Sequence, residues 1–563
     1  MPDPCAMIDE VSTAGRTVRR QRLKAPRTDG DLVAVPPLAD CREVACRNAE
    51  DLQTTGVEIL GVPLSDLRQQ AQREVLQAAK AYTGQWVSQL AAGPQTGLWF
   101  VSGHQPGLSH PGVWVKNFVV GELARREEGV GLNLVVDNDI FQGAGIRVPV
   151  GTRRNPALET VAFDSRHPAQ PWEEVRVGDR DLFASFGDRV TASMENWGIE
   201  PLVRQFWPRA IAHLSNSDRI ADALTAARNA CERDWGTANL ELPLSRLCEL
   251  DSFRLFACHI LAELPRFHSV YNAVLHEYRE INRIRSRTHP IPDLHTADGW
   301  LEAPFWVWRT GEHQRQRLLA RTVGQEIWLS DDGRETFARL PLSPEGDPAG
   351  MIGALRPLAG QGIRLRTRAL TTTLFSRLCF ADLFVHGIGG AIYDEITDRI
   401  ICRFFGIHRP QFLALSATLH LPLQTFEVSP GDEQRLVNQL RALRYNAERS
   451  PGAALPENAA DIIAEKQRLI EQQQSRNGRG SPDGRPTRQP RGSGPGYARF
   501  RRFQEISREL SAYTQSPRQQ LTRELERIRG ELAANAVMQN REYAFCLYPA
   551  EKLRNFMQSV CNF

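Results

Sequence analysis

Three histidines carry the clearest chemical signal in this sequence. His104 and His386 each follow an apolar run that has the length and the β-branched or aromatic content of a buried strand, and His110 stands at the end of the glycine-rich turn after His104. An imidazole titrates near neutral pH, so it can act as a general base or donate a hydrogen bond to a developing phosphate or carboxylate charge. We therefore expect the three rings to converge on one catalytic crevice. The competing interpretation is that each ring is an ordinary hydrogen-bonded loop residue.

Two of these histidines belong to a strand, a glycine-rich turn and a helix in direct succession. The strand is expected at residues 98–101, and Gly103 and Gly107 allow the turn that follows it. The helix is expected at Pro111–Arg126, capped by His110 or the serine before it. Unpaired N–H groups and the positive end of the helix dipole then meet at one spot, where phosphates and carboxylates bind in open α/β sheets.

Two faces of the expected helix carry polar groups. His110, Trp114 and Asn117 share one face at steps of four and three residues, and Gly112 and Lys116 share another. We expect Lys116 to reach an anion lying over Gly112 and to assist catalysis, and Asn117 to contact the substrate.

A second predicted strand brings carboxylates to the same edge of the sheet. The apolar run 132–136 ends in Asp137, Asn138 and Asp139. Asp137 and Asp139 lie two residues apart, so they would share a face of a continuing strand and could hold an amine or a ribose hydroxyl. Asn138 is expected among the substrate-binding residues. The alternative is that the two carboxylates only cap loops.

A second strand, turn and helix begins after residue 366. The apolar run 381–385 leads into His386, Gly387 and Gly389, and a helix follows in which Tyr393 is expected to contact ligand. This turn is glycine-rich, but as a phosphate-binding signature it is weak. The repetition indicates two halves of one parallel sheet. The core face of the second helix is expected to carry Ile392, Ile396, Ile400 and Phe404.

Two arginines precede this second half. Arg366 and Arg368 could clamp a substrate carboxylate, although a surface or sheet-edge position explains them nearly as well. The segment Trp300–Arg339 before them alternates like a small antiparallel sheet, and its Trp306 fits either sheet packing or stacking on a ligand.

Composition points to a soluble globular protein. The 563 residues are 41% hydrophobic and 24% charged, and 69 basic against 66 acidic residues leave a formal charge of +3 that selects no partner. We therefore expect small-molecule substrates and no membrane partner. Arginines cluster at Thr17–Arg27 and Arg476–Arg502, where nucleic acid could bind, but such clusters are more often solvated tails or linkers, so nucleic acid is not the expected partner. The ten cysteines include no C-x-x-C pair, and no secretory signal or apolar run of about 18 residues is present, so a reducing cytoplasm is the expected location.

The pattern along the chain predicts an α/β protein with a parallel-sheet core and insertions. Leu521, Leu525, Ile528 and Leu532 keep coiled-coil-like spacing and need a partner helix. The expected segments are an arm and helix at 1–92, core at 93–193, a helical insertion at 194–299, a small β insertion at 300–345, core again at 346–450, a helical hairpin at 451–540 with a disordered tip at 475–496, and a C-terminal strand and helix at 541–563.

Several motifs resemble those of the bacillithiol biosynthesis cysteine-adding enzymes. The stretch SGHQPGLSHPGVWVKN is similar to that family's T-G-Q-Q-x-G-L segment, and the DND triplet resembles its D-H-D-F. FVHGIGGAIYDEI resembles its later V-G-G-P-G-E-I-A-Y segment, and LRTRAL its L-R-P run. The resemblance covers most of residues 95 to 540. The matching positions are Gly103, Gln105, Gly107, Leu108, Asp137, Asp139, Gly387, Gly389 and Tyr393.

The resemblance implies a Rossmann-like core, similar to those of nucleotidyltransferases and class I aminoacyl-tRNA synthetases, and a coiled coil that mediates homodimers. It also implies a ligase that joins cysteine to a glucosamine–malate conjugate, with ATP and Mg²⁺ as the expected activating group. By this likeness, residues 110–112 would occupy the phosphate-binding turn. His104, Asn138 and Gly390 depart from the family's Gln, His and Glu, which leaves the substrate open.

Two other function classes fit the residues. The three histidines and two aspartates could hold a metal in a hydrolase, although no H-x-H or H-x-x-x-H spacing supports such a site. A non-catalytic ligand-binding or scaffold protein, with a coiled coil that recruits a partner, is the other alternative.

Overall fold

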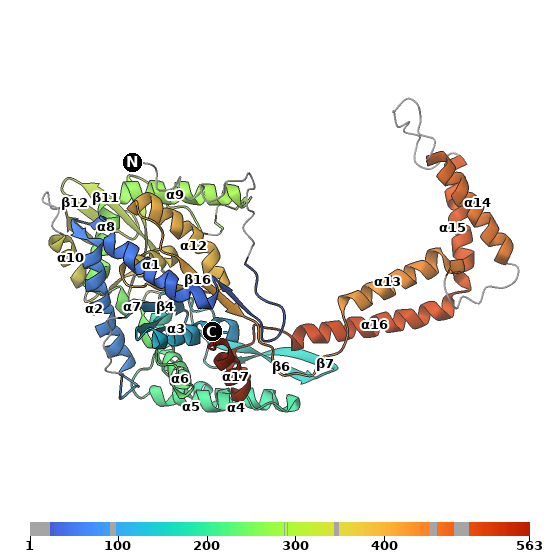
Figure 1. The fold of residues 1–563 in the computed structure, drawn as a ribbon, viewed down its shortest axis with the longest axis horizontal. Helices are drawn as coiled ribbons and strands as arrows, with labels where there is room; N and C mark the ends of the chain where they lie inside the picture. The colour runs from blue at the N-terminus through green and yellow to red at the C-terminus, as the bar shows by residue number, and fades with distance from the viewer. Residues whose placement is uncertain are drawn as a thin grey trace, which may run out of the picture. The chain divides into compact units, whose positions relative to one another are not determined.

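The computed structural model describes residues 23–90, 97–286, 288–289, 291–342, 348–449, 459–477 and 495–563. The chain divides into two compact units (Figure 1). The main unit comprises Met1–Val150, Leu158–Pro422 and Asn540–Phe563, and the second unit comprises Gly151–Ala157 and Leu423–Gln539. Residues 1–22 of the predicted arm and 478–494 of the predicted disordered tip lie outside the described residues.

The main unit is built on a six-stranded sheet. In spatial order its strands are β1 (Leu32–Val35), β16 (Phe412–Ala417), β15 (Leu383–His386), β4 (Trp99–His104), β5 (Val130–Val135) and β8 (Leu240–Pro243). The strands from β16 to β8 are parallel, and β1 pairs antiparallel with the edge of β16. The predicted α/β class with a parallel-sheet core is therefore confirmed.

The order of the strands reverses at the centre of this sheet. β4 leads through helix α3 (Pro111–Arg126) to β5 on one side, whereas β15 leads through α12 (Ile388–Ile400) to β16 on the other. β4 and β15 are neighbours, with Val385 opposite Ser102 in the register. Such a reversal opens a crevice beyond the carboxyl ends of the two strands, because their connections diverge.

The remaining helices of the main unit surround the two sheets. They are α1 (Cys41–Thr54), α2 (Leu64–Thr83), α4 (Arg180–Ser193), α5 (Val203–His213), α6 (Ile220–Asp234), α7 (Leu244–Leu247), α8 (Asp251–Ala262), α9 (Leu264–Ile281), α10 (Ala349–Leu355), α11 (Ala369–Cys379) and α17 (Ala550–Val560). α12 continues as a π-helical turn and ends at Gly406, whose φ of 71° suits glycine. Ile392 was expected on its core face but is 39% exposed, so that part of the prediction is wrong.

A second, antiparallel sheet of the main unit contains the predicted β insertion. Its strands are β9 (Thr296–Ala297), β10 (Trp300–Arg309), β11 (Gln316–Val323), β12 (Glu326–Ser330), β13 (Ala338–Pro341) and β14 (Ile363–Thr367). β14 closes this sheet by pairing antiparallel with β10, so Arg366 and Arg368 lie at the antiparallel sheet and not in the parallel core. Two small hairpins complete the strands: β2 (Glu58–Ile59) with β3 (Val62–Pro63), and β6 (Gly145–Thr152) with β7 (Asn155–Ala162).

Several elements differ from the sequence-based expectation. The segment predicted as an N-terminal arm contains β1 and α1. Charged and polar residues separate the buried positions of α1, which are Cys41, Val44, Asn48 and Leu52, and so weaken the periodicity of the pattern. The predicted helical insertion contains β8, a four-residue strand too short to show a period. The predicted C-terminal strand is instead a loop and a 3₁₀ turn at Phe545–Leu547, whose apolar side chains are buried without a strand partner.

The second unit consists of four described helices: α13 (Pro430–Tyr445), α14 (Ala459–Asn477), α15 (Pro495–Ala512) and α16 (Gln515–Met538). The coiled-coil-like spacing of α16 requires a partner helix, and that partner is α13. Leu436 of α13 packs with Leu525 and Ile528 of α16. α14 packs on α15 around Ile506 and Leu510. The predicted helix over 497–540 is thus two helices, separated at residues 513–514.

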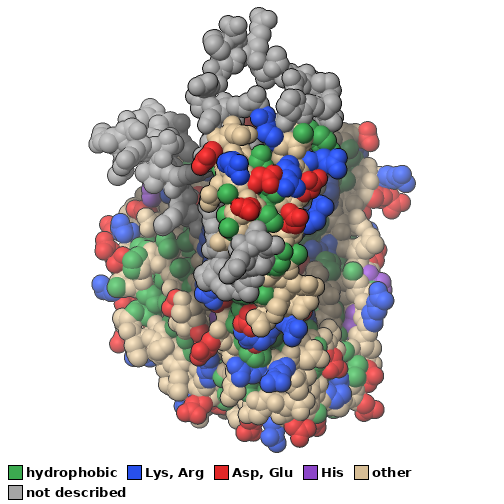
Figure 2. All heavy atoms as spheres, turned by 90° about the vertical axis from the view of Figure 1, so that its right-hand side faces the viewer, with side chains coloured by type: hydrophobic (Ala, Val, Ile, Leu, Met, Phe, Trp, Pro, Cys, Tyr) green, Lys and Arg blue, Asp and Glu red, His purple; other side chains and the backbone are tan. Residues whose placement is uncertain are grey.

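The surface carries mixed charge. On the face drawn in Figure 2, Lys and Arg side chains are interspersed with Asp and Glu, as a net charge near zero leads one to expect. None of the helices in the described ranges is both long and apolar enough to cross a membrane.

Candidate functional site

The candidate site lies at the carboxyl ends of β4 and β15, where the strand order reverses. His104 ends β4 and His386 ends β15, and the loops that follow lead to the N-termini of α3 and α12. The N-terminus of α3 is already capped, because Gly112 donates to Nδ1 of His110 and the N–H groups of Val113 and Trp114 donate to its backbone oxygen. The N-terminus of α12, which follows Gly387, is therefore the better place for an anion.

His110 is the N-cap of α3, as predicted. Its Nδ1 accepts a hydrogen bond from the backbone N–H of Gly112 at 3.1 Å. Burial, followed by the charge of Arg541, lowers the pKa of His110 to about 4. The ring is therefore neutral near pH 7, and because Nδ1 accepts, its proton resides on Nε2, which is a hydrogen-bond donor.

His104 is also held neutral. Its Nδ1 donates to the backbone oxygen of Gln105 at 2.8 Å, and its Nε2 lies 3.2 Å from Oδ1 of Asn117. Burial, followed by the charges of Arg228 and Lys116, lowers the pKa of His104 to about 3. A ring with so low a pKa is a weak base, so the role of neutral hydrogen-bonding group fits His104 better than that of general base.

Lys116 does not point at an anion over Gly112, contrary to prediction. Its Nζ donates to the backbone oxygen of Gly103 at 2.9 Å, and the side chain is buried beneath the turn. Burial, followed by the charge of Arg228, lowers the pKa of Lys116 to about 8. Gly112 instead faces the backbone of Ala417, where a Cβ would find no room. Helical periodicity groups residues on a face but cannot tell which neighbour that face meets.

Asn117 is turned toward the protein interior. Its Nδ2 donates to Glu232 at 2.7 Å, and Glu232 also pairs with the buried Arg228 at 2.7 Å. The residue therefore lies beneath His104, with its amide nitrogen committed to Glu232.

The two predicted carboxylates have different surroundings. Asp137 accepts hydrogen bonds from the backbone N–H of Ser245, at 2.9 Å, and from its hydroxyl, so it caps the short helix α7 and turns away from the crevice. Burial, followed by the charge of Glu173, raises the pKa of Asp137 to about 7. Asp137 therefore caps α7 and does not have the catalytic role that was predicted for it.

Asp139 is the carboxylate at the crevice. It accepts a hydrogen bond of 2.5 Å from Nε2 of Gln105, in the turn after β4, and lies 3.2 Å from Nη2 of Arg315. Its side chain is 39% exposed, so a ligand can reach it. Asn138 instead donates to the backbone oxygen of Thr367 at 2.8 Å and joins the two sheets.

A basic wall formed by Arg315, Arg368 and Trp306 extends the site toward the antiparallel sheet. The guanidinium carbons of Arg315 and Arg368 lie 4.7 and 4.3 Å from the centroid of the Trp306 ring. Arg368 pairs with the fully buried Glu302 at 2.6 Å through Nη1. Its Nε and Nη2 atoms are buried and have no hydrogen-bond partner among the described residues. A buried donor without an acceptor costs about 1–3 kcal/mol, which marks a place for a missing acceptor.

Arg366 does not belong to this wall. It is fully engaged with Glu173, through two hydrogen bonds of 2.9 Å, and with Glu249 at 2.8 Å. The predicted carboxylate clamp of two arginines is therefore wrong for Arg366, because Glu173 and Glu249 already neutralise its guanidinium group.

The turn after β15 combines a fixed histidine with open glycines. His386 is buried and its Nε2 lies 2.9 Å from Asp394, which also binds the buried Arg377. This network ties His386 to α12, so it does not join the other two rings as predicted. Gly387 and Gly389 border open space, since a Cβ at either position would meet nothing within 4 Å. Tyr393, one turn further along, is half-buried against the main core.

The residues predicted to hold a metal do not gather as ligands. Within the described ranges, which include all three histidines and both aspartates, no group of three or more His, Cys, Asp or Glu side chains could hold a metal ion. The arrangement required by the metal-dependent hydrolase alternative is therefore not formed by these residues.

Sequence reasoning missed Arg315 and left Glu302 without a role. Arg315 stands in the polar loop between β10 and β11, and nothing in its neighbours distinguishes it from a solvated loop arginine. Arg315 is positioned by the ring of Trp306 and by the pairing of β10 with β14. Pairing between strands far apart in the chain leaves no local signature in the sequence.

A comparison of the chain with protein-family models and with curated proteins finds no match. The case for function therefore depends on the site itself.

Proposed function

We propose that the crevice binds small anionic substrates and joins an amino acid, with cysteine as the first candidate, to a sugar-derived acceptor. The observation that carries the proposal is the pair of buried, unpartnered donor atoms of Arg368, which shares the ring of Trp306 with Arg315, the partner of Asp139. Guanidinium groups bind carboxylates through paired hydrogen bonds, so Arg368 fits the carboxylate of an acceptor such as glucosamine–malate.

The parallel-sheet core supports the proposal that the chain has the Rossmann-like arrangement implied by the resemblance. Two halves diverge from the central β4 and β15, and the N-termini of α3 and α12 lie at their carboxyl ends. The N-terminus of α12, which has no side-chain cap, suits a phosphate-bearing group better than the capped end of α3. Gly387 and Gly389 leave the start of α12 uncovered, since a Cβ at either position would meet nothing within 4 Å. The phosphates of ATP with Mg²⁺ would lie there, and ATP would activate the amino acid's carboxylate for attack by an amine.

The chain's own residues would then act as binding and charge-stabilising groups. His110 donates from Nε2 to the reacting carboxylate or phosphate, and Lys116 adds a fixed positive charge below the turn. Asp139, held by Gln105, accepts hydrogen bonds from the acceptor's amine and orients it. His104 holds the turn through its bond to Gln105 and shapes the crevice between them.

The resemblance further implies a homodimer through the helices of the second unit. Light scattering on purified protein measures this directly, and a monomer would remove that part of the proposal.

Substrate binding can be tested by calorimetric titration of glucosamine–malate, and of malate alone, into the wild type and into Arg368→Gln. We expect the variant to lose tenfold or more in affinity for both ligands. The matched control is Arg364→Gln, on the same strand, where Arg364 donates to the backbone oxygen of Ala359. Equal affinities in all three proteins would contradict the proposed carboxylate subsite.

A further inference from the structure

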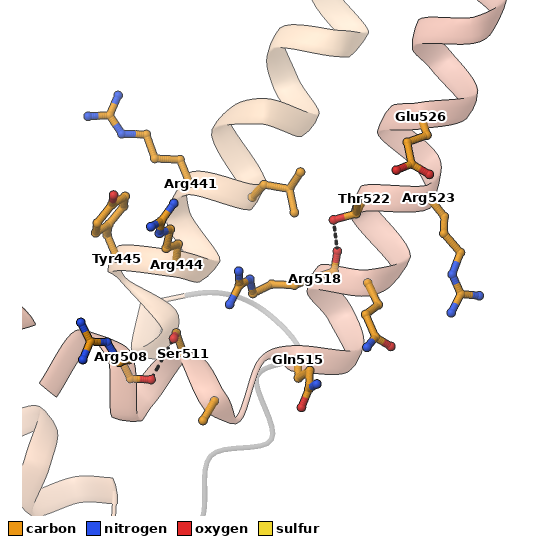
Figure 3. Close-up of a pocket in the computed structure, with 13 residues that line it drawn as sticks. Arg441, Arg444, Tyr445, Arg508, Ser511, Gln515, Arg518, Thr522, Arg523 and Glu526 are labelled. Carbon is orange, nitrogen blue, oxygen red and sulfur yellow. Dashed lines mark hydrogen bonds between the residues drawn. The ribbon is translucent and has the colours of Figure 1, made fainter. Parts of the chain in front are cut away.

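A groove of about 1060 Å³ lies within the second unit, between α13, α15 and α16. Figure 3 shows its lining, with Arg518 extending from α16 toward α13. The arginines among the lining residues are Arg441, Arg444, Arg508, Arg518 and Arg523. One carboxylate, Glu526, lines it with them. The groove belongs to a different unit from the crevice, so what it binds is independent of the proposed ligase reaction.

The arginines of the groove differ from the others on the same helices. Arg435, Arg527 and Arg529 each pair with a carboxylate, with Asp432, Glu524 and Glu433 at 2.6 to 2.8 Å. None of the five groove arginines makes an ion pair with another described residue. A group of unpaired guanidinium charges around the groove produces a local positive potential. The small net charge of the whole chain does not reveal this potential.

An exposed aromatic ring accompanies these charges. Tyr445 lines the groove and is 45% exposed, and the guanidinium carbon of Arg444 lies 5.4 Å from its ring centroid. Exposed aromatic rings beside arginines are the combination on which single-stranded nucleic acids bind, because phosphates pair with the guanidinium groups and unstacked bases lie on the ring. An acidic polypeptide would use the charges but gain little from the ring.

We propose that this groove binds a single strand of nucleic acid. The phosphates would contact arginines of α13 and α16, the two helices that line the groove with α15, and a base would stack on Tyr445. A double helix has no unstacked base to offer to the ring, so the single strand is the form that uses both features.

The proposal is tested by fluorescence anisotropy with a labelled 15-nucleotide oligo(U), titrated with the full chain over a series of salt concentrations. We expect binding that weakens with salt, with a slope of log K against log salt of about −0.7 for each phosphate contacted. The triple variant Arg441→Gln/Arg444→Gln/Arg518→Gln should bind at least tenfold more weakly and with a slope smaller by about 2. Tyr445→Ala should weaken binding about fivefold or more without changing the slope.

The matched control is Arg435→Gln/Arg527→Gln/Arg529→Gln, which removes the same charge from the same two helices outside the groove. It should retain wild-type affinity, and thermal unfolding of each variant shows whether the helices still fold. Equal weakening by control and groove variants, or no binding at low salt, would overturn the proposal. Displacement of oligo(U) by poly-glutamate at equal charge, with no effect of Tyr445→Ala, would overturn it in favour of an acidic polypeptide.

Discussion

Arg368 lies over the ring of Trp306, with its guanidinium carbon 4.3 Å from the ring centroid, and two of its nitrogen atoms have no hydrogen-bond partner among the described residues. The ring and the buried Glu302 fix the guanidinium in place before any ligand arrives. A preorganised cation loses little conformational entropy on binding, so it can contribute strongly to affinity for a carboxylate. This relationship joins the antiparallel sheet to the crevice of the parallel sheet.

The first prediction separates ligand binding by Arg368 from its role in balancing Glu302. Arg368→Gln leaves the buried Glu302 with the weaker partner Arg317, at 3.2 Å, so the variant should unfold at a lower temperature. Arg368→Gln/Glu302→Gln removes both charges and should recover most of that stability, yet still lose tenfold or more in ligand affinity. Calorimetry and thermal unfolding of the two variants provide the test. Recovery of affinity along with stability would show that Arg368 is only structural.

The second prediction concerns the imidazole of His110. His110→Ala removes both the cap on Gly112 and the donor, so it should lower turnover more than tenfold and cost about 1 kcal/mol of stability through the lost cap. His110→Ser keeps a capping oxygen, so its melting temperature should match that of the wild type while turnover stays low. Wild-type turnover in His110→Ser would show that the ring has no role beyond capping.

The third prediction is a pH dependence that arises at Asp137. Its pKa is raised from 3.8 to about 7 in the folded protein, so between these values the folded state binds more protons than the unfolded chain. The contribution of this carboxyl to stability is therefore largest at low pH and is lost as pH rises through about 7, by up to about 1.4 kcal/mol per pH unit.

Asp137→Asn removes this titration. The melting temperature of Asp137→Asn relative to the wild type should therefore rise steadily from pH 4 to pH 7, as measured by scanning calorimetry in matched buffers. A difference that is constant with pH, or that falls, would mean that Asp137 is ionised throughout this range in the folded protein.

The fourth prediction tests the packing of α13 on α16. Leu525 is 7% exposed and lies in the cluster with Leu436 and Ile528, so Leu525→Ala should cost about 2–4 kcal/mol in the second unit. Thr522→Ala, on an exposed position of the same helix, should cost far less. Hydrogen exchange followed by mass spectrometry should show faster exchange in α13 and α16 for Leu525→Ala alone. Unchanged exchange in both helices would contradict the observed packing.

Much of the local structure could be predicted because its determinants are local. α3 begins and ends at the predicted residues, since Pro111, the cap at His110 and the periodicity that follows all act within one helix. Short buried strands are local features as well, and they correctly predict that His104, Asp139 and Gly387 lie at the carboxyl ends of strands. Strand β1 could not be found, because its pairing with β16 joins residues almost 400 positions apart.

The direction of individual side chains was the least predictable feature. Lys116 and Asp137 have the expected backbone positions, but each points at a partner that sequence separation conceals. Arg315 reaches Asp139 only because the β10–β11 loop brings it beside the residues that follow β5. Such contacts depend on tertiary packing, which neither periodicity nor residue type encodes.

The most direct test of the account is a coupling assay followed by mass spectrometry. The purified chain is offered cysteine and other amino acids together with glucosamine–malate, with and without ATP and Mg²⁺, beside His110→Ser and Arg368→Gln/Glu302→Gln as folded controls. We predict a product heavier by one aminoacyl unit that forms only with ATP and is depleted in both controls. Absence of coupled product from the folded wild type under every condition would contradict the proposed ligase activity.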